Sequence, residues 1–317
     1  MALRQTENLH PSARNLDGRA DDQILSLLLA GQIEALMSVQ PALPQIVKAA
    51  QLMARCLRAG GRLCYAGAGS SALMANADGI ELPGTYSIAP DRILLRMAGG
   101  IPTTADMPGD TEDDAEDGAR AAVADGLAAD DLVIAVTASG STPYPLALAR
   151  TARQQGASVV AVACNEAAQI FEAADVAVCL STPPEIVAGS TRMGAATAQK
   201  VALNLMSTLA AIRLGQVHDG MMVGLKADNA KLRQRAAGIV ATISGADEAA
   251  ALSALDQVGG AVKEAVLVAM GEPPDRARTL LQQEGGILRA ALARRTRPAG
   301  GRRELSKTEK TNQGSET

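Results

Sequence analysis

Hydroxyl-bearing turns follow two short apolar stretches of the sequence. One reads Gly67-Ala-Gly-Ser-Ser71, the other reads Ser139-Gly-Ser-Thr142, and each leads into a stretch of helical character. The amino end of a helix offers free N–H groups and a partial positive charge, so such turns hold phosphates, with Ser and Thr hydroxyls as further donors. The alternative is an ordinary strand-to-helix turn in which Ser caps the helix. The candidate ligands are Ser70, Ser71, Ser139, Ser141 and Thr142.

Neither turn matches a nucleotide-binding motif. No Gly-Lys-Ser/Thr follows either of them, as a P-loop requires, and Ala72 occupies the sixth position of a dinucleotide fingerprint. The two turns indicate an anion site without identifying the ligand.

Two acidic places have the residue types for acid–base chemistry. Glu81 lies beside Leu82 and Pro83 in a segment that we expect to be irregular; partial desolvation there would favour the protonated form that a general acid needs. The segment 106–117 holds seven acids in twelve residues, including Glu112. The alternative for Glu81 is an ordinary surface glutamate. The alternatives for the segment 106–117 are a solvated acidic loop or a helix start whose acids are stabilised by the helix dipole.

A third group of candidates precedes a long helical stretch. Ser190 or Thr191 is expected to cap that helix, and Arg192 then falls in its first turn, where a cation opposes the helix dipole. Arg192 is therefore a candidate for an anionic substrate, with a structural ion pair as the alternative.

Cysteine and histidine usage gives no support for a metal site. The four cysteines form no CxxC pair, and His10 and His218 are the only histidines. We therefore expect free thiols and no metal site. With a polar amino terminus and no long apolar run, this predicts a cytoplasmic protein without a membrane partner.

The elements that position these residues alternate between strands and helices. Nearly continuous apolar strands separated by helices predict a parallel sheet covered on both faces, which is an α/β fold with ligands beyond the carboxyl ends of the strands. The expected strands are 62–66, 93–97, 131–137, 158–164 and 176–180. Helices are expected from Asp21, where Asp21 or Asp22 can act as the cap, to a break at Pro41 and Pro44, and then over 45–59, 142–155 and 190–213.

The chain divides into four parts by pattern. We expect a helical arm over 1–52, a sheet domain over 53–216, a helical subdomain over 217–293 and a disordered tail over 294–317.

Composition narrows the function. The chain has 317 residues with 30 Lys and Arg against 34 Asp and Glu, and only three Tyr, one Phe and no Trp. A net charge of −4 disfavours a nucleic-acid partner, and a sugar would be held by hydrogen bonds rather than by stacking on aromatic rings.

Taken together, these segments resemble the N-acetylmuramic acid 6-phosphate etherases, enzymes built on a sugar isomerase (SIS) domain. The resemblance spans about residues 6–292. The matching motifs are Thr6-Glu7 with Pro11 to Asp17, GGRLCYAGAGSS, ELPGTY from Glu81, Thr111-Glu112-Asp113, ASGSTPY, PEIVAGSTRM with TAQKVALN, and QEGGILR from Gln283.

The resemblance implies a fold, a reaction and a pair of catalytic residues. The fold would be a three-layer αβα sandwich with a five-stranded parallel sheet. The reaction would cleave the D-lactyl ether of N-acetylmuramic acid 6-phosphate by elimination and water addition, without a cofactor. The family's two catalytic glutamates fall on Glu81, expected as the proton donor, and on Glu112. Ser70 and Ser71 or Ser139 to Thr142 would hold the phosphate, and the family's fold favours the latter turn.

The chain departs from the family pattern at several places. Leu73, Ser141 and Gly194 stand where the family usually has Arg, Arg and Lys, and Gly84 replaces a proline. These departures leave substrate preference and efficiency open. The alternative functions are a non-catalytic sugar-phosphate regulator, similar to the glucokinase regulatory proteins, and an aldose–ketose isomerase. The apolar residues of 190–213 and the helical arm further predict a homodimer with active sites near its interface.

Overall fold

A computed structural model describes residues 5–107, 109–225 and 230–295. Its centre is a five-stranded parallel sheet in the order β2-β1-β3-β4-β5. These strands are rich in Val, Ile, Leu and Ala, and β1 and β3 are buried along their whole length because helices cover both faces. The strands are β1 (Leu63–Gly67), β2 (Ile93–Met97), β3 (Leu132–Thr137), β4 (Ser158–Ala163) and β5 (Val176–Cys179).

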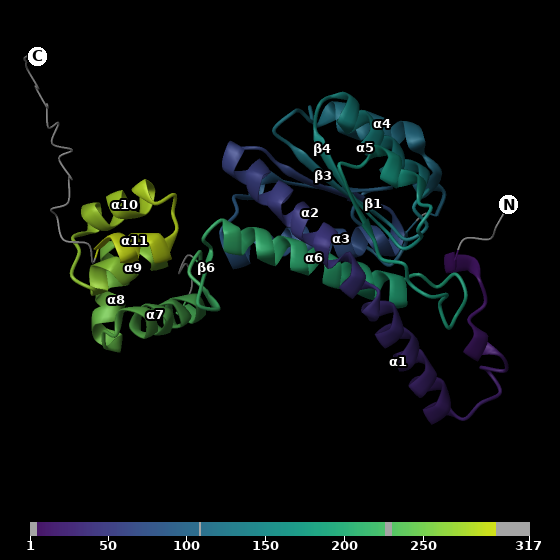
Figure 1. The fold of residues 1–317 in the computed structure, drawn as a ribbon, viewed down its shortest axis with the longest axis horizontal. Helices are drawn as coiled ribbons and strands as arrows, with labels where there is room; N and C mark the ends of the chain where they lie inside the picture. Colours follow the sequence, from purple (N-terminus) through teal and green to yellow (C-terminus); the bar gives the residue numbers. More distant parts are fainter. Residues whose placement is uncertain (1–4, 108, 226–229, 296–317) are drawn as a thin grey trace, which may run out of the picture.

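The three amino-terminal helices and α6 lie on one face of the sheet. The hydrophobic cluster on this face has more buried residues than the cluster on the other face. Buried residues of α2, α3 and α6 join alternate residues of the strands in one hydrophobic cluster, and α1 packs on α6. Figure 1 shows α1 extending beyond this layer. The helices of this layer are α1 (Asp21–Met37), α2 (Val39–Ala59), α3 (Gly69–Tyr86) and α6 (Gly194–Arg213).

The opposite face is covered by α4 (Ala115–Ala124) and α5 (Pro143–Gln154). Their buried residues form a second cluster with the other set of strand residues. The chain is therefore an α/β sandwich of three layers, as the sequence predicted. Short 3₁₀ turns link its elements: η1 (Gln5–Glu7), η2 (Pro11–Ala13), η3 (Pro90–Arg92), η4 (Gly109–Asp113) and η5 (Gln169–Ala173).

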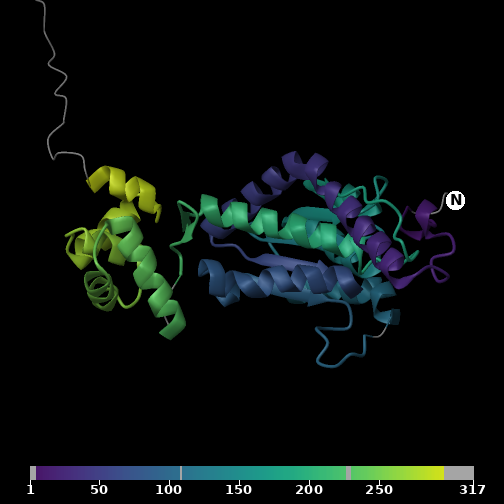
Figure 2. The same cartoon turned by 90° about the horizontal axis from the view of Figure 1, so that it is seen from below.

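The carboxyl-terminal helices form a third, separate core. Figures 1 and 2 show them as a body beside the far end of α6, reached through a short hairpin that the sequence pattern does not predict. The elements are β6 (Val217–His218), β7 (Met221–Met222), α7 (Ala230–Ser244), α8 (Glu248–Gln257), α9 (Val262–Ala269), α10 (Pro274–Gln283) and α11 (Leu288–Arg295). Lys263 joins this body to α6, because its Nζ donates to the carbonyls of Gly215 (3.0 Å) and Gly286 (2.9 Å).

Several expected boundaries were wrong, each for a local reason. Pro41 and Pro44 do not interrupt α2; the break falls at Ser38, and α2 starts at Val39, which places Pro41 in its first turn, where a missing N–H costs little. Asp21 and Asp22 lie inside the first turn of α1, and the cap is Ala20.

The expected tail begins too early. Arg294 and Arg295 still belong to α11, and they pair with Glu284 (2.7 Å) and Glu272 (3.0 Å). The rest of the expected tail, 296–317, lies outside the described residues.

Within the described residues, no single helix is long and apolar enough to cross a membrane; α1 and α2 meet that test only as a pair bent by 45°.

A hydroxyl-lined cavity with carboxylates at its rim

A cavity of about 400 Å³ opens at the carboxyl edge of the sheet. Its walls come from the turn after β1, the turn after β3, the η4 segment, the loop before α6 and the amino-terminal η1. Of the residues proposed from the sequence, it collects Ser70, Ser71, Glu112, Ser139, Ser141 and Thr142. The carboxyl ends of parallel strands thus bring together turns that lie about seventy residues apart in sequence.

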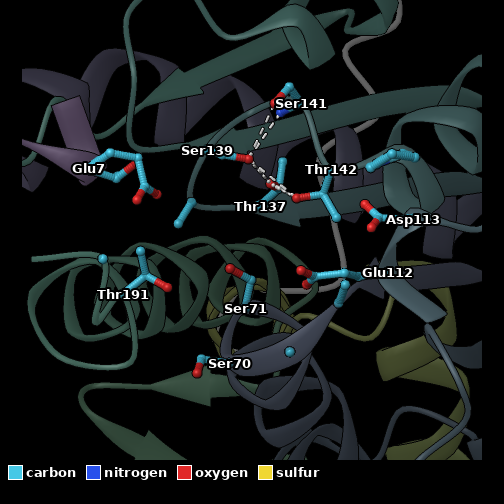
Figure 3. Close-up of a pocket in the computed structure, with 16 residues that line it drawn as sticks. Glu7, Ser70, Ser71, Glu112, Asp113, Thr137, Ser139, Ser141, Thr142 and Thr191 are labelled. Atoms are coloured by element: carbon cyan, nitrogen blue, oxygen red, sulfur yellow. Dashed lines mark hydrogen bonds between the residues drawn. The ribbon is translucent and has the colours of Figure 1, made fainter. Parts of the chain in front are cut away.

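The turn after β3 forms a cluster of four hydroxyls. The Thr137 Oγ1 lies 2.8 Å from the Thr142 Oγ1, and the Ser139 Oγ lies 3.3 Å from the same atom and 3.5 Å from the Ser141 Oγ. Figure 3 shows these side chains together on one wall of the cavity. A hydroxyl can exchange a hydroxyl partner for a phosphate oxygen without losing a hydrogen bond, so this wall suits an oxyanion.

The backbone beneath the hydroxyl cluster is held firmly. Asn165 donates from Nδ2 to the carbonyls of Ala138 (3.0 Å) and Ser139 (3.3 Å). Gly140 has a φ of +78°, and a Cβ there would lie 2.2 Å from the Cβ of Ala168, so only glycine fits. The turn therefore presents its hydroxyls in a fixed arrangement.

The turn after β1 starts α3 without a side-chain cap. Gly69 is the first residue of the helix, with a φ of +51°, and the cap residue Ala68 has no hydroxyl. Ser70 and Ser71 therefore do not serve as caps, contrary to the alternative interpretation, and both line the cavity. Free first-turn N–H groups make this helix start a second place for an anion or a sugar hydroxyl.

Glu112 lies over the start of α3. A Cβ built on Gly69 would be 3.9 Å from the Glu112 Oε2, which places the carboxylate at the wall that both residues form. Glu112 belongs to η4. Asp114 follows the last residue of η4 and caps α4 by accepting from the N–H of Asp117 at 2.8 Å. The acidic segment thus has both a structural member, Asp114, and a member directed at the cavity, Glu112.

Glu7 is a further carboxylate at the cavity. In the sequence it stands out only as part of the motif Thr6-Glu7 and not as a candidate site residue. Glu7 lines the wall opposite Glu112, and Figure 3 shows the two approaching from opposite sides. Its position is fixed by the loop before α6, because the N–H of Gly189 donates to the carbonyl of Thr6 at 3.2 Å. Asp113, Thr137 and Thr191 also line the cavity and were not proposed.

The remaining predicted residues lie outside the cavity. Glu81 is exposed on α3, which continues as a helix through Pro83 to Tyr86, so the expected irregular segment was wrong. Pro83 falls in the last turn of α3, and the N–H of Ser87 closes that turn on the Pro83 carbonyl at 3.0 Å. Glu81 is not among the residues that line the cavity.

The loop before α6 differs from expectation. The helix starts at Gly194, so Ser190 and Thr191 do not cap it and Arg192 lies outside its first turn. The buried Glu185 caps it instead, accepting from the N–H groups of Gly194 and Ala195 at 2.9 Å each. A carboxylate there matches the helix dipole better than a hydroxyl does. Ser190 lies between two lining residues but does not line the cavity.

The electrostatics of the cavity are unusual for an anion site. Its described lining contains three carboxylates, Glu7, Glu112 and Asp113, and no Lys, Arg or His. Arg192 is exposed next to the lining residue Thr191, and it forms no ion pair with the described residues. A bound anion would therefore accept its hydrogen bonds from hydroxyls and backbone N–H groups.

Two titratable side chains next to the cavity lining are buried: Cys164, whose N–H donates to the carbonyl of Ala138, and Tyr144, which follows Pro143. Burial raises the pKa of the Cys164 thiol to about 12, and burial also raises the pKa of Tyr144 to about 12. Within the described parts of the chain, no three His, Cys, Asp or Glu residues gather as a metal site. Carboxylates are thus the acid–base groups that the cavity offers.

The curated relatives that match most of the chain share one name. The SIS domain family matches residues 33–164. The chain is 41% identical to the N-acetylmuramic acid 6-phosphate etherase of Deinococcus radiodurans over 290 residues, which cover 91% of this chain and 95% of the relative. It is 38% identical to the etherase of Serratia proteamaculans, covering 91% of this chain and 98% of the relative. The solved phosphoheptose isomerase of Francisella tularensis is 18% identical, with a TM-score of 0.44 over 61% of this chain and 98% of that one.

Proposed function

The chain belongs to the N-acetylmuramic acid 6-phosphate etherase family, and from that membership we propose that it cleaves the D-lactyl ether of N-acetylmuramic acid 6-phosphate. The products are D-lactate and N-acetylglucosamine 6-phosphate, so the enzyme is a carbon–oxygen lyase of amino-sugar recycling. One observation carries the proposal: the segment that matches the etherase relatives spans about nine-tenths of the chain. Most of the residues that line the hydroxyl-rich cavity, Glu112 among them, lie within this part of the protein.

The phosphate is assigned to the hydroxyl cluster of Ser139, Ser141 and Thr142. That cluster supplies several donors on a rigid turn, as the hydrogen bonds of Asn165 and the fit of Gly140 indicate. Ser70 and Ser71, at the start of α3, then face the sugar hydroxyls.

Glu112 takes the role of base at C2 of the open-chain sugar. The C1 aldehyde acidifies the C2 proton, and removing that proton expels the lactate oxygen from C3, leaving a C2=C3 double bond conjugated with the aldehyde. Water then adds its oxygen to C3 and a proton to C2. Each proton transfer by a positioned carboxyl group is worth about 10²–10⁴-fold in rate.

Glu81 is assigned as the acid that protonates the departing lactate oxygen, acting in the cavity of a partner subunit. Eleven helical steps lead from Ser70 to Glu81, a distance of ~16 Å along the α3 axis, which is longer than a glutamate side chain. Because α3 runs away from the cavity, Glu81 cannot enter the cavity of its own chain.

The proposed homodimer rests on the helical layer that holds Glu81. Most of the exposed large apolar side chains lie on α1, α2, α3 and α6, and Ile80, next to Glu81, is 58% exposed. In α1 only Ala35 is buried, although Leu25, Leu29 and Ile33 are more than half exposed. A second copy of the chain, packed against this layer, would cover these side chains.

Arg192 is the proposed partner of the lactyl carboxylate. It is exposed at the cavity rim, and the cavity wall itself supplies no cation. Ser190, between two lining residues, is proposed to contact the same group. The positions where the family usually has a cation, Leu73, Ser141 and Gly194, offer none here, which gives Arg192 a larger share of the charge balance.

We further assign the enzyme to the cytoplasm. All four cysteines are free thiols, as suits a reducing compartment. The regulator and isomerase hypotheses lose support, because the curated relatives matched over nine-tenths of the chain are etherases.

The direct test is incubation with N-acetylmuramic acid 6-phosphate and an assay for released D-lactate. In heavy-oxygen water the label should enter C3 of the sugar product and not the lactate. No lactate, or label in the lactate oxygen, would contradict the elimination and water addition.

A further inference from the structure

A smaller cavity of about 130 Å³ adjoins the main one across Glu112. Gly69 and Glu112 line both cavities, so the carboxylate lies at their common wall. The rest of the small cavity comes from the end of β2 and the segment that follows it, including Met97, Pro102 and Met107. The mechanism proposed above leaves this space unused.

The two cavities differ in chemistry. Hydroxyls dominate the main one, whereas Met97, Pro102 and Met107 give the small one apolar walls. The charged side chains of its described lining are the carboxylates of Asp106 and Glu112. A phosphate or a lactyl carboxylate would meet like charge there without a cation, which is unfavourable in a confined space. The small cavity therefore suits a neutral group with an apolar end.

Building on the proposed function, we propose that the small cavity binds the N-acetyl group of the substrate and selects it by size. A volume of about 130 Å³ is several times the ~30 Å³ share of one water molecule, so it holds a group of a few non-hydrogen atoms. The acetyl methyl contacts Met97, Pro102 and Met107, and the amide nitrogen points back toward the common wall.

This placement fixes the reacting carbon. The amide nitrogen is bonded to C2, so seating the acyl group in the small cavity brings C2 to the wall formed by Glu112 and Gly69. The remainder of the sugar runs through the main cavity toward the hydroxyl cluster. Acyl recognition and removal of the C2 proton thus occur on the two sides of one carboxylate.

The test is a series of N-acyl muramic acid 6-phosphates with the wild-type enzyme, with D-lactate release as the readout. A pocket of fixed size discriminates by about 10–200-fold per methylene. We expect kcat/KM to be highest for N-acetyl, about tenfold lower for N-formyl and N-propionyl, and about 100-fold lower for N-butyryl. Equal kcat/KM for N-acetyl and N-butyryl would overturn the proposal.

Two variants locate the effect. Met97→Ala enlarges the small cavity and should move the optimum to N-propionyl; Met107→Ala should do the same and, with the side chain 43% exposed, disturbs the core less. Met270→Ala, in the carboxyl-terminal body, is the matched control and should keep the N-acetyl optimum. An optimum unmoved in both Met97→Ala and Met107→Ala would also overturn the proposal. Lactate release from none of the substrates would instead refute the proposed function itself, and this inference with it.

Discussion

The two ends of the central sheet use charge in opposite ways. At the amino end, Asp131 before β3 accepts from the Arg62 guanidinium at 2.6 Å, from the Arg62 N–H at 2.8 Å and from the Ala128 N–H at 3.1 Å. At the carboxyl end, Glu7, Glu112 and Asp113 line a cavity whose described lining has no cation. The fold satisfies its charges at one end and leaves them available at the other.

The pKa values at the amino end reflect this pairing. Burial alone would raise the pKa of Asp131. The hydrogen bonds from the Arg62 side chain and from backbone N–H groups outweigh burial and hold the pKa below 3.8, the ordinary value of an aspartate. Residues whose polar atoms are already satisfied stabilise the fold. Residues whose partners are interchangeable hydroxyls, as around Thr137, are free to bind a ligand.

Helix α3 connects the two ends. It begins at the cavity with Ser70 and Ser71 and runs back along the sheet to Glu81. The different surroundings of the two glutamates proposed to be catalytic are explained if each active site combines Glu112 of one chain with Glu81 of the partner subunit.

The largest expected effect is on catalysis. Glu112→Gln and Glu81→Gln each retain shape and remove the transferable proton, so each should lower kcat by at least about 10²-fold while substrate binding persists. Steady-state kinetics of D-lactate release, with a binding assay, test this. Full activity in both variants would refute the assignment.

The next effect concerns assembly. Ile33→Asp on α1, 53% exposed, should dissociate the proposed dimer. It should then lower kcat about as far as Glu81→Gln does, because the proposed site would lose the partner's Glu81. Val123→Asp on α4, 60% exposed on the opposite face, is the control and should change neither. Light scattering and kinetics measure both. A fully active monomer would contradict the account.

A change at the amino end should affect stability rather than catalysis. Asp131→Asn weakens the pairing with Arg62 and should cost about 1–3 kcal/mol in the free energy of unfolding, with kcat unchanged. The ionised Asp131 stabilises the fold above its unfolded pKa. Wild-type stability should therefore fall as the pH drops below 3.8 through the lowered folded pKa, and this contribution should be absent from the variant. Urea denaturation as a function of pH is the measurement, and identical acid profiles would contradict it.

The smallest effect should come from adding a cation to the carboxyl end. Ser141→Arg supplies the charge that the cavity lining lacks and should lower KM several-fold, more at low salt than at high salt. Gly194→Lys is a poorer choice, because a Cβ there would lie 2.8 Å from the Cβ of Ala35. An unchanged KM for Ser141→Arg would show that the hydroxyls already meet the phosphate fully.

Much of the fold was predictable from the sequence, because apolar strands alternate with helices throughout the sheet region. The five strands fall within a residue or so of expectation, and β2 matches it fully. The α6 start was misjudged because its cap, Glu185, comes from nine residues before Gly194 rather than from the adjacent residues. Local capping rules cannot anticipate such a contact.

The candidate site was predictable where its residues end strands. Ser70, Ser71, Ser139, Ser141 and Thr142 follow β1 and β3, so parallel strands bring them together. Glu7 and Thr191 were missed because they reach the cavity through the packing of η1 on the loop before α6, which has no periodic signal. In the proposed dimer, Glu81 reaches the cavity of a second chain, which a single sequence does not reveal.

The most direct test of the account mixes two inactive variants. Glu81→Gln and Glu112→Gln chains, unfolded and refolded together, should form mixed dimers in which one site has both wild-type glutamates. Random pairing into twofold-symmetric dimers then predicts about a quarter of the wild-type rate of D-lactate release, from chains that are nearly inactive alone. A mixture no more active than its components would contradict a site shared between two subunits.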